Sequence, residues 1–289
     1  MPTIRKRSLR RKDPRERPIG VFDSGVGGLT VLHELLVTLP EENFVYLGDT
    51  ARFPYGGRSA AELQEFSLEI ADELLVHDAK LLVIACNSAT AAALPVLQQR
   101  MMATTLGIDV VGVVRPEAVQ AVAETRNGKI GLLATEATVA SGAYSDALAT
   151  IDPYVDLTAV PCPDLAPIIQ HGDAINEHVV DVVRGYTRPL VDAGVDTVIL
   201  GCTHYPLVRP LIQRMLGRNV TLVTSGGALA RQVEHALSAR GLETTRQTEG
   251  HYSFLTTGDA EEFRSLGSRF LQLPLSDVNH IDLTRKAPA

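Results

Sequence analysis

Residues 81–93 read LLVIACNSATAAA and place a cysteine at a junction between two kinds of structure. Residues 81–85 form a continuous apolar run of strand length, and the alanine-rich run after Ser88 favours a helix. Cys86 therefore lies where a buried strand passes into a helix. Taken alone, it is best explained as a small core residue, because free cysteine is often buried.

A second stretch repeats this arrangement. Residues 197–209 read TVILGCTHYPLVR, in which an apolar strand again ends in a small residue and a cysteine, Cys202. A polar pair follows, Thr203 and His204, and then another helix-like run. Two cysteines in matching positions are difficult to explain by packing alone.

Elsewhere the chain alternates between short apolar runs and longer amphipathic segments. The clearest helix covers residues 59–78: it opens on SAAE, which fits a capping box, and its apolar residues recur at helical spacing. Strands that alternate with helices indicate an α/β fold with parallel sheets. Strands are predicted at residues 19–23, 44–48, 81–85, 110–114, 129–134, 155–160, 197–201, 220–224 and 251–256.

The predicted strands form two sets that follow one another along the chain. This spacing predicts a duplicated α/β unit. Corresponding positions, between 110 and 116 residues apart, are Ile19 with Ile130, Val45 with Asp156, Cys86 with Cys202, and Val111 with Thr221.

The two cysteines lie where such a fold binds its ligands. In parallel α/β sheets, ligands bind beyond the carboxyl ends of the strands. If the two units face each other across a cleft, Cys86 and Cys202 enter it from opposite sides. Inversion of a stereocentre by proton transfer needs a base on one face and an acid on the other. A thiol can take both roles near neutral pH, because helix N-termini and cationic groups lower its pKa, and both cysteines precede apparent helices.

Each thiol has a candidate helper. Asp23 ends the first predicted strand at the same sheet edge as Cys86, and His204 follows Cys202 by two residues. Asp23 can equally be a turn or helix cap, and His204 a packing histidine.

Two loops at this edge also suggest ligand binding. Gly25, Gly27 and Gly28 in DSGVGGLT resemble an anion-binding loop, but neither a Walker loop nor GxGxxG is present. Residues 49–58, DTARFPYGGR, are either an ordinary connection or a wall of the cleft.

Composition excludes several classes of protein. The 289 residues are 45% hydrophobic and 21% charged, and no apolar run approaches the roughly 20 residues of a membrane span. The basic N-terminus lacks the apolar core of a signal peptide, so a cytoplasmic location and no membrane contact are expected. Three cysteines argue against a disulfide framework, and without a CxxC no metal site is expected.

Charge is unevenly distributed. Residues 1–17 carry +6 and the remainder −13, which gives the net charge of −7. An acidic body is a poor surface for nucleic acid. Residues 1–17 are predicted to be a disordered, solvated tail that catalysis does not need, although contact with nucleic acid, membrane or a partner protein is an alternative.

Four motifs together resemble the glutamate racemases of the aspartate/glutamate racemase superfamily: DSGVGGLTV, the PYG loop, ACNSAT and GCTHYPL, over residues 18–283. This resemblance implies interconversion of L- and D-glutamate without a cofactor, supplying D-glutamate for peptidoglycan and hence for cell wall and cell shape. It also implies two pseudosymmetric α/β domains, 18–113 plus 223–289 and 114–222, with the active site between them, and commonly a homodimer.

The resemblance also assigns residues. It implies that Cys86 and Cys202 are catalytic, that Asp23 and His204 assist them, and that Cys162 is not catalytic. The substrate-binding positions that it implies are Asp23, Ser24, Tyr55, Gly56, Asn87, Ser88, Thr135, Thr138, Thr203 and His204.

Two positions depart from the family pattern. Ser88 stands where Thr is frequent and keeps the hydroxyl. Gln170 stands where Glu is usual, which leaves the orientation of His204 open. Alternatives to the racemisation of glutamate are racemisation of aspartate, a Cys–His hydrolase that would leave Cys86 unexplained, and an interaction protein acting through its tail.

Overall fold

The computed structural model describes residues 13–103, 107–172 and 176–283. Most of the predicted tail, residues 1–12, lies outside these ranges. Its last residues are part of the fold, contrary to the prediction: the 3-10 helix η1 (Pro14–Glu16) packs against the body, and the backbone oxygen of Arg15 accepts a hydrogen bond of 2.6 Å from Lys80 Nζ.

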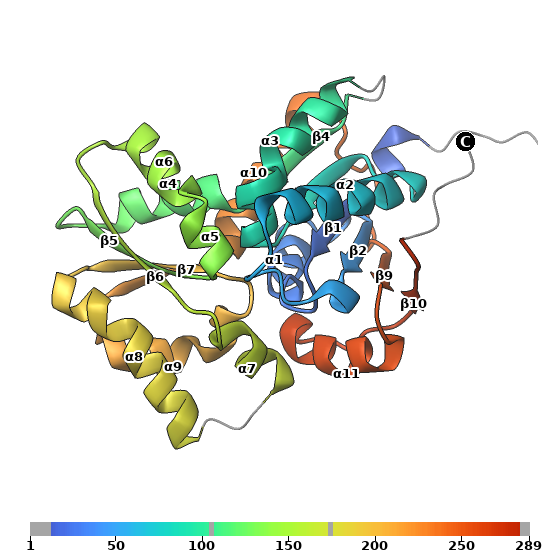
Figure 1. Ribbon diagram of the computed structural model, residues 1–289. Helices are drawn as coiled ribbons and strands as arrows, with labels where there is room; N and C mark the ends of the chain where they lie inside the picture. Colours follow the sequence, from blue (N-terminus) through green and yellow to red (C-terminus); the bar gives the residue numbers. More distant parts are fainter. Residues whose placement is uncertain (1–12, 104–106, 173–175, 284–289) are drawn as a thin grey trace, which may run out of the picture.

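All the predicted strands are present, and they form two sheets in which every pairing is parallel (Figure 1). The six-stranded sheet has the order β10-β9-β2-β1-β3-β4, and the four-stranded sheet the order β6-β5-β7-β8. The short strand β10 was not predicted. The strands are β1 (Ile19–Asp23), β2 (Phe44–Gly48), β3 (Leu81–Ile84), β4 (Asp109–Gly112), β5 (Lys129–Ala134), β6 (Asp156–Pro161), β7 (Thr197–Gly201), β8 (Thr221–Val223), β9 (Tyr252–Thr256) and β10 (Val278–His280).

The strand orders confirm the duplicated unit. The order β2-β1-β3-β4 in one sheet matches β6-β5-β7-β8 in the other, so β3 and β7, which precede the two cysteines, hold equivalent places. The strand registers show that Val45 corresponds to Thr158 and that Val111 corresponds to Val223. Each of these counterparts lies two residues after the one predicted from the sequence. Because side chains alternate along a strand, a difference of two residues keeps each on its predicted face.

Helices cover both faces of each sheet, so the sheets are doubly wound (Figure 1). The predicted helix at residues 59–78 is α2, and Ser59 with Glu62 forms the predicted capping box. The helices are α1 (Leu29–Thr38), α2 (Ala60–Val76), α3 (Asn87–Ala103), α4 (Val114–Glu124), α5 (Glu136–Ala140), α6 (Ala143–Ile151), α7 (Leu165–His171), α8 (Glu177–Ala193), α9 (Arg209–Leu216), α10 (Ser225–Arg240) and α11 (Ala260–Leu271), with 3-10 helices η2 (Thr50–Arg52) and η3 (Tyr205–Val208).

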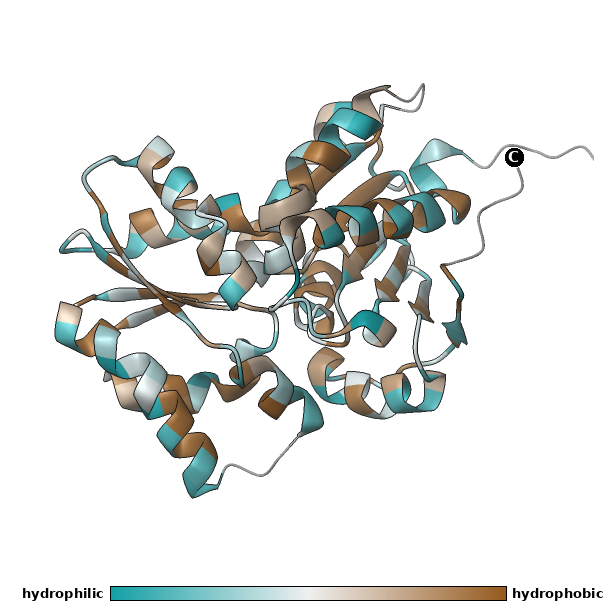
Figure 2. Ribbon diagram, in the orientation of Figure 1, coloured by the Kyte–Doolittle hydropathy of each residue, from teal (hydrophilic) through white to brown (hydrophobic). Residues whose placement is uncertain are grey.

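Among the described residues the core has three apolar clusters, and one of them spans both sheets. Neighbouring residues of β1 show the division: Val21 packs toward α1, α10 and α11, whereas Phe22 packs toward α2 and α3. The cluster that contains Val21 continues beneath the four-stranded sheet to α8 and α9, and the third lies between this sheet and α4 and α6. Figure 2 shows the corresponding hydrophobic strands enclosed by helices with polar outer faces. The shared cluster fixes the carboxyl ends of the two sets of strands relative to each other.

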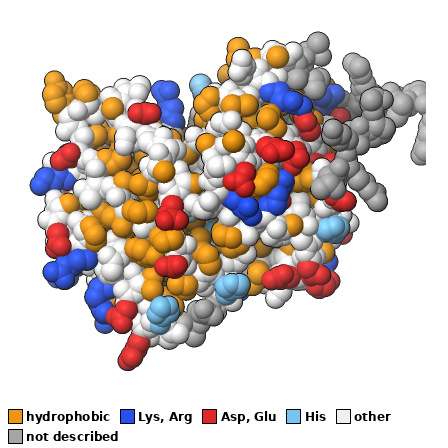
Figure 3. All heavy atoms as spheres, viewed as in Figure 1, with side chains coloured by type: hydrophobic (Ala, Val, Ile, Leu, Met, Phe, Trp, Pro, Cys, Tyr) orange, Lys and Arg blue, Asp and Glu red, His pale blue; other side chains and the backbone are white. Residues whose placement is uncertain are grey.

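Surface charge on the face drawn in Figure 3 is mixed. Basic side chains of the described residues are scattered there beside acidic ones and form no continuous basic patch. None of the helices in the described part of the chain is both long and apolar enough to span a membrane.

Candidate functional site

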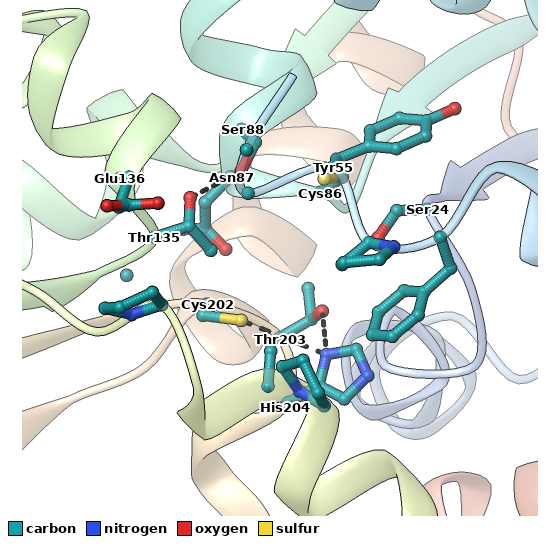
Figure 4. A pocket seen from close by; sticks show the side chains of 18 residues that line it. Ser24, Tyr55, Cys86, Asn87, Ser88, Thr135, Glu136, Cys202, Thr203 and His204 are labelled. Atoms are coloured by element: carbon teal, nitrogen blue, oxygen red, sulfur yellow. Dashed lines mark hydrogen bonds between the residues drawn. The ribbon is translucent and has the colours of Figure 1, made fainter.

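A cavity of about 50 Å³ lies at the carboxyl ends of strands from both sheets. Its walls come from the segments that follow β1, β2 and β3 and from those that follow β5, β6 and β7, which are equivalent strands of the two units. A single water fills roughly 10–15 Å³ of such a cavity, so the space suits a small solute. The predicted residues that line it are Ser24, Tyr55, Gly56, Cys86, Asn87, Ser88, Thr135, Cys202, Thr203 and His204 (Figure 4).

Two predicted residues lie behind this lining. Asp23 is fully buried and touches the site through Thr203, whose Oγ1 donates to its carboxylate at 3.3 Å. Thr138 is buried behind Thr135 and Ser88, with hydroxyl contacts of 2.9 and 3.1 Å to them. Thr138 therefore supports the wall of the cavity. Ser88, which stands where threonine is frequent in the family pattern, uses its hydroxyl in this contact.

Cys86 lies between β3 and the first residue of α3, as predicted, and is 5% exposed. The Ala89 N–H in the first turn of α3 donates to its sulfur at 3.5 Å, which favours the thiolate. Burial has the larger effect and, together with the negative charge of Asp23, raises the pKa of the thiol to about 12. The helix N–H lowers this pKa as expected, but the net shift is upward, because desolvation outweighs one N–H donor.

Asp23 is an ionisable base beside this thiol. Burial raises the pKa of its carboxyl group to about 6, against the lowering effect of hydrogen bonds that include one of 3.1 Å from Gly25 N. At neutral pH the group is mostly ionised. A base of this strength can accept a proton from a thiol and return it.

The glycine loop packs closely and is not an open anion cradle. A Cβ atom at Gly27 would lie 2.4 Å from ring atoms of His204, and one at Gly28 would lie 2.4 Å from Asp23 Cβ. The Gly25 N–H already donates to Asp23. The loop therefore brings Asp23 and His204 together across the two sheets, and this close approach requires glycine.

Cys202 follows β7, but its setting differs from that of Cys86. The 3-10 helix η3 begins three residues later and α9 follows it at Arg209, so the helical run predicted after this sulfur starts as a 3-10 helix and not as an α-helix. Burial raises the pKa of the Cys202 thiol well above its ordinary value, opposed by the backbone N–H of His204. The thiol therefore rests protonated and needs a neighbouring base.

His204 is the side chain whose ring nitrogen faces this sulfur. Its Nδ1 lies 3.9 Å from Cys202 Sγ, and its Nε2 lies 2.9 Å from Gln170 Oε1. Because this amide oxygen accepts a hydrogen bond, Nε2 carries the proton and the lone pair of Nδ1 faces the thiol. Burial between the rings of Phe53 and Phe270 lowers the pKa of His204 to about 3. Gln170 thus orients His204 without the usual carboxylate.

Of the two possibilities for residues 49–58, the structure shows the second: residues 53–57 of the loop after β2 form a wall of the cavity. The hydroxyl of Tyr55 donates to Asp49, which is fully buried and also accepts 2.6 Å from Arg52 Nε. Figure 4 shows this hydroxyl pointing away from the cavity. Tyr55 therefore anchors the loop, and a contact with a ligand would come from its backbone or the adjoining Gly56.

A buried polar cluster that the sequence does not predict lies next to this cavity. Glu117 of α4 contacts Asn87, Tyr144 and Ser225, which come from three other helices. A glutamate after a proline in an amphipathic helix gives no sign of burial, so no pattern in the sequence indicated it. No group of three or more His, Cys, Asp or Glu side chains suited to a metal occurs in the described ranges.

Comparisons with known proteins give a consistent result. A family model described as Asp/Glu/hydantoin racemase matches residues 30–233. The glutamate racemase of Beutenbergia cavernae is 44% identical over 284 residues, which cover 94% of this chain and 96% of that protein. The structure of a glutamate racemase isoform from Bacillus anthracis matches with a TM-score of 0.88 at 38% identity, covering 94% of this chain and 100% of that one. The glutamate racemase of Francisella tularensis in complex with D-glutamate matches with a TM-score of 0.86 at 32% identity, covering 93% and 99%.

Proposed function

The chain belongs to the glutamate racemases of the Asp/Glu/hydantoin racemase family, and from this premise we propose that it interconverts L- and D-glutamate by a two-thiol mechanism. The observation that carries the mechanism is the pair Cys86 and Cys202. They follow equivalent strands, β3 and β7, and both sulfurs enter one small cavity. The relatives described above are glutamate racemases, which favours glutamate over aspartate as the substrate.

The resting protonation states suit proton transfer in both directions. Both thiols are neutral because burial raises their pKa values, whereas Asp23 is ionised and His204 is neutral at pH 7. The ammonium group of bound glutamate adds a positive charge to the cavity, which favours a thiolate. We propose that Asp23 takes the proton of Cys86 in one direction and that His204 takes that of Cys202 in the other.

In each direction one proton leaves Cα and another arrives on the opposite face. The thiolate on one side removes the Cα proton and becomes a thiol, and the thiol on the other side donates its proton to Cα and becomes a thiolate. By family resemblance the Cys86 side removes the proton from D-glutamate and the Cys202 side removes it from L-glutamate. The substrate-binding assignments are proposals on the same basis, made for Asp23, Ser24, Tyr55, Gly56, Asn87, Ser88, Thr135, Thr138, Thr203 and His204.

Hydrogen exchange in D₂O tests this function. With either enantiomer as substrate, the product should carry deuterium at Cα from the first turnovers, while the unreacted substrate stays largely protiated. The reason is that the acid and the base are different groups on opposite faces. The measurement is NMR or mass spectrometry of each enantiomer after chiral separation.

The same reaction should proceed after exhaustive dialysis against EDTA and without pyridoxal phosphate, because thiol chemistry suffices. Early deuterium in the unreacted substrate would argue for a single base. No exchange with either enantiomer would refute the racemisation of glutamate, and activity restored only by added metal would refute the cofactor-independent mechanism.

The wider role follows from the same resemblance. We propose that the D-glutamate supplies peptidoglycan synthesis, that the protein acts in the cytoplasm and that it forms a homodimer. We also propose that residues 18–113 plus 223–289 form one domain and residues 114–222 the other. The division of strands between the two sheets supports these boundaries.

A further inference from the structure

Glu117 is a buried carboxylate at the meeting point of four helices. Its side chain lies in α4, is fully buried, and accepts hydrogen bonds from Asn87 at the start of α3, Tyr144 of α6 and Ser225 at the start of α10. The Asn87 Nδ2–Glu117 Oε2 distance is 3.1 Å. These helices pack on different sheets, so the carboxylate joins both halves of the molecule.

Asn87 is the member of this cluster that also lines the cavity, where Figure 4 shows it among the other side chains. Its Nδ2 donates to Glu117 and, at 2.7 Å, to the hydroxyl of Tyr144, so both amide hydrogens are used. Its Oδ1 is buried and has no hydrogen-bond partner among the described residues, and the whole residue is 2% exposed. A buried amide oxygen without a donor is costly and calls for one.

The chemistry of glutamate identifies that donor. At neutral pH the two carboxylates of the substrate only accept hydrogen bonds, whereas its α-ammonium group only donates them. A free amide oxygen therefore suits the ammonium group. If the Asn87 amide turned over, its N–H groups would face this cation and repel it.

We propose that ionised Glu117 is a positioning residue that fixes the Asn87 amide with its oxygen toward the substrate ammonium group. The assignment rests on the proposed function, since glutamate is the ligand. It goes beyond that function because Glu117 does not line the cavity and acts on the substrate through Asn87.

The groups that contact Glu117 keep their charge near neutral pH, so the ionisation of Glu117 controls the hydrogen bonding in this cluster. Its contacts among the described residues are neutral donors, and of these Tyr144 alone titrates, with a pKa held well above its usual range by burial and by the charge of Glu117. Strands β7 and β8, which also pack against α4, carry no ionisable side chain. Burial raises the pKa of Glu117 to about 7, opposed by its three hydrogen bonds.

Protonation of Glu117 should weaken binding. Below its pKa the carboxyl group can donate a hydrogen bond to Asn87 Oδ1, which allows the turned amide that repels the substrate ammonium group. The affinity for glutamate should therefore fall as pH falls through about 7. Asp23, with a pKa of about 6, gives a separate change at lower pH.

The test is Glu117→Gln, which keeps the size of the side chain and removes its charge. At pH 8 we expect KM for both enantiomers, and Kd by calorimetry, to rise roughly tenfold, as for loss of a hydrogen bond to a charged group. The value of kcat should change much less, and the rise in Kd that the wild type shows as pH falls through about 7 should disappear. The matched control is Ser225→Ala: it removes the donor to the other carboxylate oxygen, so Kd at pH 8 should stay within about twofold and the rise should move to higher pH.

A double-mutant cycle separates positioning from general structure. Asn87→Ala should raise KM, and Glu117→Gln should add little in that background, because Glu117 acts through Asn87. Unchanged Kd in Glu117→Gln, or additive effects in the cycle, would overturn the assignment of Glu117 while leaving racemisation intact. If Glu117→Gln does not fold, the pH dependence of Kd tests the assignment of Glu117. A wild-type Kd that stays constant between pH 6.5 and 8, or a pH dependence that Ser225→Ala does not shift, would overturn that assignment equally. Wild-type protein that does not bind glutamate would refute the proposed function itself and this inference with it.

Discussion

Cys86→Ala and Cys202→Ala are each expected to lower kcat for racemisation by at least roughly 10³-fold in both directions. In the proposed mechanism each turnover uses both thiols, one as base and the other as acid, so losing either should interrupt L-to-D and D-to-L conversion alike. No other thiol among the described residues can substitute, because Cys162 is fully buried and does not line the cavity. The measurement is steady-state kinetics from each pure enantiomer by polarimetry or coupled assay.

Cys162→Ala is the matched control for these variants. It removes a buried thiol of the same size, whose Sγ donates to the backbone oxygen of Val160 at 3.4 Å. Racemisation by this variant should stay close to that of the wild type. Circular dichroism and thermal unfolding show whether all three variants remain folded. Wild-type activity in folded Cys86→Ala or Cys202→Ala would refute the two-thiol mechanism.

Asp23→Asn and His204→Asn should slow the two directions unequally, with the larger effect for Asp23. Asp23 is a base with a pKa of about 6, whereas burial leaves His204 with a pKa of about 3. A stronger base contributes more to proton transfer, and general bases typically contribute 10²–10⁴-fold. We therefore expect kcat from D-glutamate to fall roughly 10²-fold in Asp23→Asn, and kcat from L-glutamate to fall less in His204→Asn.

Gln170 explains the smaller effect expected for His204. A carboxylate beside Nε2 would stabilise the imidazolium form, but the neutral amide oxygen at 2.9 Å orients the ring without supplying a charge. Glutamate enantiomers have equal free energy, so kcat/KM must stay equal for the two directions in every variant. Any asymmetry in kcat must therefore be matched in KM.

The kinetics of Asp23 should also show a pH dependence with a definite sign. Asp23 is protonated below its pKa, so kcat/KM in the wild type, which reports the pKa values of the free protein, should fall as pH falls through about 6. Asp23→Asn should lack this change. Primary isotope effects with Cα-deuterated substrate establish that proton transfer is being observed. Wild-type kcat in both variants and both directions would show that neither residue assists its thiol.

Local sequence patterns predict every strand except the short β10, together with the duplication and the position of each cysteine. These features are local: an apolar run of strand length followed by a helical period predicts a strand–helix junction wherever it occurs. Cys86 and Cys202 were predicted to follow equivalent strands, and β3 and β7 do hold equivalent places. The capping box at Ser59 was predicted for the same reason, because its partners lie three residues apart.

The protonation states and the supporting contacts depend on the packing of distant segments and are not predictable from local patterns. The local pattern predicts a lowered pKa for Cys86 beside a helix, but desolvation by the surrounding protein raises it, and burial depends on distant segments. Gln170 reaches His204 from α7, and Glu117 reaches Asn87 from α4. Contacts between residues far apart in the chain leave no periodic signal, so a single sequence places the reacting groups while the packed fold sets their charge and orientation.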